Sequence, residues 1–292
     1  IFVMKSIPPP DPNTNIPAFL MPKLACDAHC HVFGPNETFP YTVNRRYTPP
    51  DAPKEKLKEL HKILGIERAV IIQASCHGVD NSAMIDAIAS NRNSYRGVCN
   101  ADISFTKKDF NFLHEKGICG IRFNFVKHLG GAPNIGEVKQ IIDRVSSLPW
   151  HVELHFDAAD IIKYEKLLDE IPAPIVIDHM GRVSANEGLN QESFRLLLAK
   201  LKSNNNLWIK ISGCERISSE GPPYFDAIPF GEACARAAPD RCLWGTDWPH
   251  PNVGIIPNDG DLVDILPSMI NDIALQQKIL VDNPARLYNF GF

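Results

Sequence analysis

A chain of 292 residues with 44% hydrophobic and 22% charged residues has the composition of a soluble globular protein, and it is long enough to bury a large core. A net charge of -4 at pH 7 without any basic run argues against nucleic acid as a partner. No apolar stretch approaches the roughly 20 residues that a membrane-spanning helix needs, so we expect no membrane partner either.

The cysteines and the first residues indicate the compartment. Eight cysteines lie mostly inside apolar runs and none forms a Cys-x-x-Cys pair, which favours buried thiols in a reducing environment. The chain does not begin with a charged region followed by an apolar segment, so we expect no signal peptide and a cytoplasmic location. The sequence leaves open whether the residues before Met4 are native and whether the protein forms a homo-oligomer.

The N-terminal residues 1–23 are rich in proline, with six prolines between residues 5 and 23. We expect an extended arm there, followed by a single domain over residues 24–292. The first strand is predicted over residues 24–30. Residues 32–53 are rich in Pro, Asn, Thr and Tyr and are too long for a simple turn, which is typical of a functional loop.

From residue 54 onward, predicted helices and strands alternate. Short apolar runs such as residues 69–72 and 175–177 show no polar alternation, as expected for strands covered on both faces. Together with residues 24–30, the predicted strands are 68–73, 96–103, 118–125, 150–156, 175–179, 207–212 and 242–246; the predicted helices are 54–64, 81–89, 107–115, 135–145, 158–169, 191–201, 230–238 and about 261–289. Eight such pairs in under 300 residues favour a single (β/α)8 barrel over a doubly wound sheet.

The first predicted strand ends in a His-x-His motif. Because side chains alternate along a strand, His29 and His31 point to the same face. Two convergent histidines suit a divalent metal, or they can polarise a bound carbonyl group by donating hydrogen bonds. The plainer interpretation is one buried and one solvent-facing histidine.

Other predicted strands also end in polar residues, and the C-terminal strand ends carry the reactive groups of such barrels. Strand alternation allows His155, His179 and Asp247 to face the same mouth as His29 and His31. Four imidazoles and one carboxylate can bind Zn²⁺ and leave a position for water. The alternative is that the histidines hydrogen-bond the substrate with no metal present.

Three arginines, Arg122, Arg182 and Arg216, stand at or just after strand ends. Arginine presents a planar fork of donors that matches a carboxylate, so three of them around one mouth predict an anionic substrate. Taken singly, each arginine has the plainer interpretation of a surface or ion-pair residue. Lys127 and His128 follow the fourth strand and extend the same anion site.

The remaining histidines have plainer interpretations. We expect His61 and His114 to lie on the surfaces of helices. His77 and His250 follow strand ends and are candidates to line the site, whereas His151 begins the fifth strand and belongs to the opposite end of the barrel.

Five segments of the chain form a recognisable set: Asp-Ala-His-Cys-His-Val-Phe-Gly-Pro (27–35), Gln-Ala-Ser-Cys-His-Gly (73–78), Gly-Ile-Arg-Phe-Asn-Phe (120–125), Ile-Asp-His-Met-Gly-Arg (177–182) and Trp-Gly-Thr-Asp-Trp-Pro-His-Pro (244–251). This set resembles one branch of the amidohydrolase superfamily, the 2-pyrone-4,6-dicarboxylate lactonases, whose relatives include 4-sulfomuconolactone hydrolases. The resemblance runs from about residue 24 to the C-terminus. It implies an amidohydrolase-type (β/α)8 barrel that hydrolyses a cyclic ester.

The resemblance also implies roles for individual residues. Asp247 matches the general base that activates water, and His29, His31 and His179 match the groups that polarise the lactone carbonyl. Substrate contacts are implied for Tyr47, Ser75, Arg122 and Arg216, and Arg182 matches the motif arginine. The dicarboxylate lactonases are understood to work without a metal.

Two departures from these lactonases bear on the substrate and the cofactor. His128 stands where they have a second arginine, which weakens one carboxylate contact. His155 stands where they have a tyrosine, which restores the histidine set of metal-dependent amidohydrolases. Both departures favour a zinc-dependent relative of the 4-sulfomuconolactone hydrolase kind.

The sequence therefore predicts hydrolysis of a small anionic unsaturated lactone in the degradation of aromatic compounds, with Asp247 activating water and one zinc ion as cofactor. Two alternatives stay open: a lactone isomerase on the same scaffold, and a non-catalytic barrel that binds organic anions. The presence of Asp247 argues against the binding barrel, because a carboxylate repels a bound anion and is unfavourable in such a site unless it takes part in the reaction.

Overall fold

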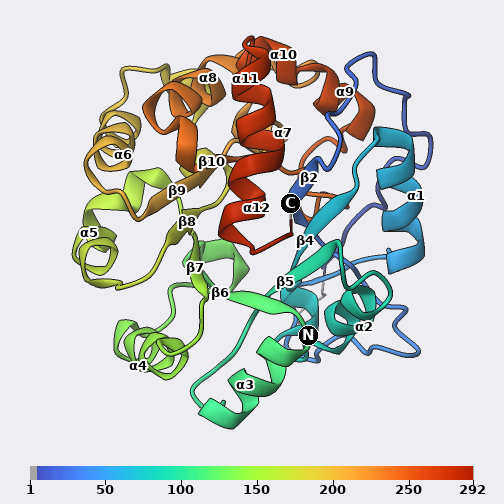
Figure 1. Ribbon diagram of the computed structural model, residues 1–292, viewed down its shortest axis with the longest axis vertical. Coiled ribbons are helices and arrows are strands. Elements are labelled where there is room, and N and C mark those ends of the chain that lie inside the picture. Colours follow the sequence, from blue (N-terminus) through green and yellow to red (C-terminus); the bar gives the residue numbers. More distant parts are fainter. Residues whose placement is uncertain (1–4, 292) are drawn as a thin grey trace.

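The computed structural model of the chain describes residues 5–291, apart from the side chain of His128. Eight parallel strands form a barrel surrounded by helices (Figure 1). In chain order and in sheet order the strands are β2 (Cys26–Cys30), β4 (Arg68–Ile72), β5 (Tyr95–Cys99), β6 (Ile118–Asn124), β7 (His151–His155), β8 (Ile175–Ile177), β9 (Leu207–Lys210) and β10 (Cys242–Leu243). The predicted (β/α)8 barrel is confirmed.

The segment after β10 closes the barrel against β2. The amide of Ala28 donates to the carbonyl oxygen of Trp244 at 2.9 Å, and the amide of Asp247 donates to that of His29 at 2.7 Å. A third bond of 2.8 Å joins the amide of His31 to the carbonyl oxygen of Trp248. The first and last strands therefore meet along a backbone seam, and both sides of that seam carry candidate site residues.

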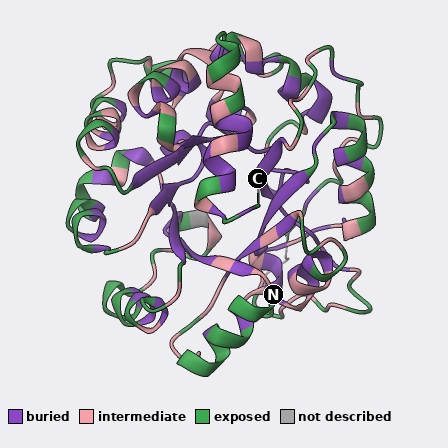
Figure 2. Ribbon diagram, in the orientation of Figure 1, coloured by how far each residue is buried: buried purple, intermediate pink, exposed green. Residues whose placement is uncertain are grey.

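Helices cover the outside of the barrel and alternate with the strands. They are α1 (Lys54–Leu64), α2 (Ser82–Ala89), α3 (Lys107–Glu115), α4 (Ile135–Val145), α5 (Ile161–Glu170), α6 (Glu192–Ser203), α7 (Cys214–Ile217) and α8 (Ile228–Ala237). Figure 2 shows buried strands inside and helices that expose their outer faces. In α4, for example, Val138, Ile141, Ile142 and Val145 form the buried stripe that the helical spacing predicts.

The C-terminal helical region is broken into short pieces. It contains α9 (Asp259–Asp264), α10 (Leu266–Met269), α11 (Ile273–Gln277), a π-helical turn over Lys278–Asp282, and α12 (Asn283–Leu287). Tyr288 and Phe290, which follow α12, pack with the interior residues Val70, Val98 and Val176. These aromatic rings close the N-terminal end of the barrel, and Figure 1 accordingly shows the C-terminus near its axis. No helix among the described residues is long and apolar enough to cross a membrane.

The proline-rich arm lies against the barrel. Its short strand β1 (Lys5–Ser6) pairs in parallel with β3 (Tyr47–Thr48) from the long loop. Further along the arm, the amide of Phe19 donates to the Asp264 carboxylate of α9 at 2.8 Å. The arm therefore supports the loop that carries Tyr47.

Several strands are shorter than predicted, and this changes how two candidate residues reach the mouth. β8 ends at Ile177 and β10 at Leu243, so His179 and Asp247 lie outside the strands. Both adopt left-handed backbone conformations, with φ of +50° and +64°. Strand alternation therefore does not set their direction; turns after the strands do.

Candidate active site

A small pocket of about 30 Å³ lies at the C-terminal ends of the barrel strands. Eight of the residues predicted from the sequence line it: His31, Tyr47, Ser75, Arg122, His155, His179, Arg216 and Asp247. His29 lies directly below this surface and is fully buried. The residues that the sequence places at strand ends therefore meet around one mouth.

Asp247 is buried at the centre of this group. Its Oδ1 atom lies 3.3 Å from His31 Nε2 and 3.6 Å from His29 Nε2, and its Oδ2 atom lies 3.8 Å from His179 Nε2. Arg216 Nε also contacts Oδ2. Although burial opposes ionisation, the charge of Arg216 and the nearby imidazoles hold the pKa of Asp247 well below its usual value. Asp247 is therefore a carboxylate at neutral pH.

Three imidazoles of the site, those of His29, His155 and His179, have pKa values below their usual range and are uncharged at neutral pH. Burial lowers the pKa of His179 to about 3. Burial and the charge of Lys210 hold the pKa of His29 well below its usual value, and burial with the charge of Arg122 does the same for His155. Neutral imidazoles can coordinate a metal or hydrogen-bond a carbonyl group.

The outer hydrogen bonds fix how two of the rings face the cavity. His31 Nδ1 lies 2.9 Å from the carbonyl oxygen of Ile72, which only accepts, so this nitrogen carries the proton. His179 Nδ1 lies 3.0 Å from the hydroxyl of Ser212. In its neutral form His31 therefore presents the lone pair of Nε2 toward Asp247.

The donor set fits a divalent metal. His29, His179 and Asp247 each offer one ligand atom, and these atoms lie within 4.8 Å of one another. Asp247 Oδ1 and His29 Nε2 are buried and have no hydrogen-bond partner among the described residues. The lone pair of His31 Nε2 and the carboxylate oxygen of Asp247, 3.3 Å apart, are acceptors that a cation between them would satisfy.

The fifth predicted ligand, His155, lies to one side of this group. Its ring centroid is 5.5 Å from that of His179, and it is not part of the convergent set. Both of its ring nitrogens are buried without a hydrogen-bond partner among the described residues. His155 lines the cavity and is available to a bound molecule.

Two of the three predicted arginines lie in the cavity wall. Arg122 Nε donates to Asp178 Oδ2 at 2.8 Å, and Arg216 is held by Asp247 and by the carbonyl oxygen of Pro251. Arg182 is not among the lining residues, because its Nε donates to Asp157 Oδ1 at 2.8 Å. The structure therefore brings Arg122 and Arg216 to the mouth and places Arg182 outside it.

The long loop contributes the opposite wall. Tyr47 is buried, and its hydroxyl accepts a hydrogen bond from Ser75 Oγ at 3.3 Å. The side chain of His128, the predicted extension of the anion site, lies outside the described residues. Its neighbour Leu129 lines the cavity. Asn124, Pro251 and Asn252, to which the sequence analysis gave no role, complete the lining.

Beneath the histidines lies a cluster of buried charges to which the sequence analysis assigned no function. Lys210 Nζ donates to Glu153 Oε2 at 2.5 Å and lies 3.3 Å from Asp178 Oδ1. Arg122 Nε contacts the same two carboxylates, at 2.8 Å for Asp178 and 3.4 Å for Glu153. The signal for this cluster was present, because Glu153, Asp178 and Lys210 are charged residues within the predicted strands 150–156, 175–179 and 207–212.

A second buried cluster lies behind the loop after β10. His250 was a candidate to line the cavity, but it lies between Glu215 and Asp259, 3.5 Å and 3.0 Å away. Although burial opposes its charge, these carboxylates raise the pKa of His250 to about 10. His250 therefore holds the loop that brings Pro251 and Asn252 to the mouth.

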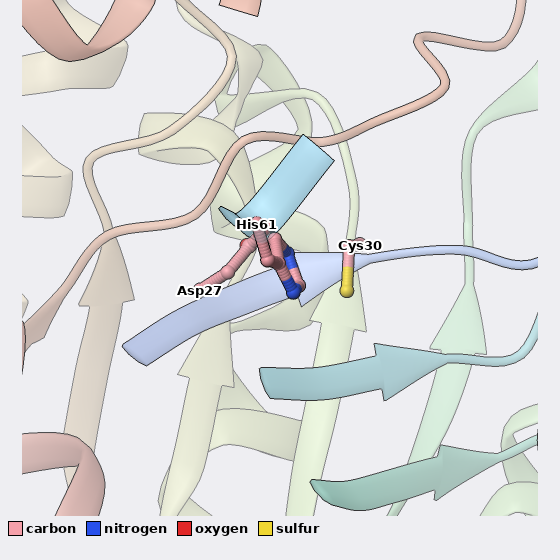
Figure 3. A group of neighbouring side chains, drawn as sticks. All are labelled: Asp27, Cys30 and His61. Carbon is pink, nitrogen blue, oxygen red and sulfur yellow. Dashed lines mark hydrogen bonds and ion pairs between the residues drawn. The ribbon is translucent and has the colours of Figure 1, made fainter. Parts of the chain in front are cut away.

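The prediction that His61 is a surface residue is wrong. Figure 3 shows His61 of α1 beside Asp27 and Cys30 of β2. Asp27 accepts hydrogen bonds from His61 Nε2, from the amide of His29, and from the amide and hydroxyl of Thr246. With four donors this carboxylate is saturated, so the group fastens β2 to the segment that carries Asp247 and is no open metal site.

A (β/α)8 barrel with paired histidines on the first strand and an aspartate after the last defines an enzyme of the amidohydrolase type. A family model described as amidohydrolase matches residues 26–290, and the chain belongs to that family.

Within this family, the chain is similar to two lactone hydrolases and to one solved structure. The chain is 43% identical over 285 residues to a 2-pyrone-4,6-dicarboxylate hydrolase of Comamonas testosteroni, covering 94% of this chain and 93% of the relative. It is 40% identical over 275 residues to a 4-sulfomuconolactone hydrolase of Rhizobium radiobacter, covering 93% and 92%. A solved structure of a probable 2-pyrone-4,6-dicarboxylic acid hydrolase from Acinetobacter baumannii, with citric acid bound, superposes with a TM-score of 0.80 at 26% identity, covering 91% of this chain and 100% of that one.

Proposed function

We propose that this protein hydrolyses a small anionic unsaturated lactone of the 2-pyrone-4,6-dicarboxylate or 4-sulfomuconolactone type, in the degradation of aromatic compounds. The observation that carries the proposal is one ionised carboxylate, Asp247, surrounded by an arginine and by histidines from the end of the first barrel strand and from the turn after the sixth. Relatives at 43% and 40% identity bear the names of such hydrolases, and a related structure holds an organic polycarboxylate.

The reaction needs a general base, groups that polarise the lactone carbonyl, and residues that bind the substrate's anionic group. Asp247 takes a proton from water, and the hydroxide attacks the ring carbonyl carbon. The bond between that carbon and the ring oxygen then breaks. The ring oxygen leaves as an enolate or alkoxide and receives the proton from Asp247, so one water molecule is consumed.

The remaining residues of the site stabilise the charge that develops during the reaction and orient the substrate. His29 and His179, whose Nε2 atoms face Asp247, lie where they can hydrogen-bond the developing oxyanion, which is the charge that preorganised donors stabilise best. Arg122 and Arg216 hold the carboxylate or sulfonate of the substrate, with Tyr47, Ser75 and His155 lining the same cavity. Arg182, the remaining predicted substrate contact, pairs with Asp157 and does not line the cavity.

A zinc ion is part of the proposal. His29, His31, His179 and Asp247 would hold it, with a further position left open for water or substrate. When bound, zinc would polarise the lactone carbonyl as a Lewis acid. Metal analysis of the purified protein, with activity measured before and after treatment with a chelator, tests this part. Full activity of a protein containing less than about 0.1 equivalent of any divalent metal would contradict it.

The test of the reaction uses both candidate lactones in ¹⁸O-labelled water. Hydrolysis places one labelled oxygen in the product carboxylate, whereas an isomerase transfers the ester linkage without adding label. A barrel that only binds anions would leave both lactones unchanged while still binding them in a calorimeter. Either of these two outcomes would overturn the proposed hydrolysis.

A further inference from the structure

The long loop, residues 32–53, contacts a three-residue 3-10 turn that follows β4. Ser75, the first residue of this turn, donates from its hydroxyl to the hydroxyl of Tyr47 at 3.3 Å. The carbonyl oxygen of Cys76, the second residue, accepts from the amide of Thr42 at 2.8 Å. These two contacts hold the middle and the later part of the loop.

The third residue of the turn, His77, holds the first part of the loop at two points. Its Nε2 atom accepts a hydrogen bond from the amide of Gly34 at 3.1 Å. Its Nδ1 atom lies 3.3 Å from the carbonyl oxygen of Pro40, which only accepts, so Nδ1 carries a proton. The ring of Tyr41 packs against the imidazole, with 5.0 Å between the ring centroids. His77 is therefore buried under the loop and does not line the cavity, for which the sequence made it a candidate.

The hydrogen bond that Nε2 accepts needs a neutral imidazole, because a protonated ring has no acceptor left. Burial lowers the pKa of His77, although a backbone carbonyl oxygen and the carboxylates of Asp80 and Asp51 oppose this effect. Among the described residues, these two carboxylates and the phenol of Tyr41 are the titratable groups that face His77. The folded loop therefore favours the neutral ring, and protonation breaks the bond to the loop amide.

Two contacts link this part of the loop to the cavity wall. Phe33, which precedes Gly34, packs on the ring of Tyr47 with 6.5 Å between the ring centroids. Further along, Arg45 Nε donates to the hydroxyl of Thr48, the neighbour of Tyr47, at 2.9 Å. Tyr47 is buried and lines the cavity. Movement of the loop near Gly34 is therefore expected to displace Tyr47.

We propose that His77 is a positioning residue that places Tyr47 in the cavity wall by fastening the long loop, and that it releases the loop when it is protonated. Substrate binding then weakens in mildly acidic solution. The loop does not carry Asp247, so KM changes more than kcat. The effect on the substrate rests on the proposed hydrolysis, but the fastening of the loop does not.

Linkage gives the pH range. A histidine in a released loop has an ordinary pKa of about 6.5, whereas the fastened loop holds the pKa of His77 lower. The released state therefore binds more protons, and the fastened loop loses stability as the pH falls below about 6.5. Between pH 7.5 and pH 5.5 the ratio of fastened to released loop should fall about 5-fold.

Hydrogen–deuterium exchange of the full chain measures the loop without substrate. Peptides from residues 32–48 are compared at pH 7.5 and 5.5, after correction for the intrinsic pH dependence of exchange. In the unaltered protein we expect protection to be about 5-fold lower at pH 5.5. In His77→Gln, whose side-chain oxygen accepts from the Gly34 amide and does not titrate, protection should be equal at the two pH values. In His77→Phe, which removes the acceptor, it should be low at both.

Protection that is independent of pH in the unaltered protein overturns the proposal. The same conclusion follows if His77→Gln keeps the pH dependence of the unaltered protein, or if folded His77→Phe is fully protected. The unaltered protein and His77→Gln decide the question if His77→Phe does not fold. None of these measurements requires that a lactone be hydrolysed.

Kinetics on both candidate lactones test the consequence for the cavity. From pH 7.5 to 5.5, KM of the unaltered protein should rise about 5-fold relative to that of His77→Gln, with a smaller change in kcat. His114→Gln is the matched control, because this histidine on α3 accepts a hydrogen bond from Trp150 Nε1 at 3.1 Å and contacts neither the loop nor the cavity. It should follow the unaltered protein in loop protection and in KM. Equal KM values for His77→Gln and the unaltered protein at both pH values contradict the positioning of Tyr47, whereas failure to hydrolyse either lactone counts against the proposed function and the exchange result still decides the fastening.

Discussion

The C-terminal end of the barrel is lined by polar and charged side chains, whereas the N-terminal end is closed by apolar ones. At the C-terminal end, Asp247 and the histidines form a buried polar layer above the charged cluster of Lys210. At the N-terminal end, Tyr288 and Phe290 close the barrel with apolar contacts to the inward-facing valines. The comparison teaches that one end supplies the chemistry and the other supplies the burial that offsets the cost of placing charges inside.

The largest expected effect comes from the base at the polar end. Asp247→Asn keeps the shape of the side chain but removes the group that accepts a proton from water, so kcat should fall by at least about 10³-fold. Steady-state kinetics on both candidate lactones and thermal unfolding of the same samples provide the measurement. Asp143→Asn on the exposed face of α4 is the control and should retain full activity. Near-normal turnover by Asp247→Asn would remove the base from the mechanism.

At the apolar end we expect a loss of stability and no loss of chemistry. Tyr288 is fully buried, so Tyr288→Ala should lower the free energy of unfolding by about 3–5 kcal/mol through the cavity it leaves. Its hydroxyl has no hydrogen-bond partner among the described residues, so Tyr288→Phe should be neutral or stabilising by about 1 kcal/mol. Denaturant unfolding gives these values. A large fall in kcat for folded Tyr288→Phe would show that the two ends are not separate in function.

A smaller effect distinguishes the arginines at the mouth. Arg122→Lys keeps the charge next to Asp178 but loses the planar fork, so KM should rise about 10-fold with a smaller change in kcat. Arg182→Lys should change KM less than about 2-fold, because that arginine pairs with Asp157 and does not line the cavity. Equal effects of the two substitutions would mean that Arg182 reaches the substrate after all.

A further effect is a pH dependence confined to the polar end. The pKa of His250 is raised to about 10 in the folded protein, above the value of roughly 6.5 in an unfolded chain. Its contribution to stability is therefore fully present below about pH 6.5, declines as the pH rises, and is lost above about pH 10. Unfolding free energies between pH 6.5 and 10 should fall less steeply in His250→Asn than in the unaltered protein. Tyr288→Ala should leave this slope unchanged, and identical slopes in His250→Asn and the unaltered protein would refute the assignment.

The sequence was sufficient for the fold because its signals are local. Apolar runs such as residues 69–72 and the helical stripe of α4 repeat in alternation, and few architectures accommodate eight such pairs. The same rule for strand ends brought most of the candidate residues to one mouth. These parts depend on spacing within a few residues, which a sequence displays directly.

The details of the site depend on contacts that spacing does not encode. His179 and Asp247 reach the mouth through left-handed turns and not through strand alternation. The contact between Lys210 and His29 joins residues 181 positions apart, and Arg182 is drawn to Asp157 by a pairing that its motif does not reveal. His61 on a helix was misassigned because the partner that buries it, Asp27, lies on another element.

The backbone bond between the amide of Asp247 and the carbonyl oxygen of His29 has a consequence for how the enzyme is made. The groups it joins come from the first barrel strand and from the segment after the last one, so we expect this bond to form only after the intervening strands have folded. A growing chain is therefore expected to lack a complete active site until the residues around Asp247 have been synthesised and have folded. We expect activity only after the segment that follows β10 has docked on β2. The time at which activity appears during refolding would therefore report that docking step.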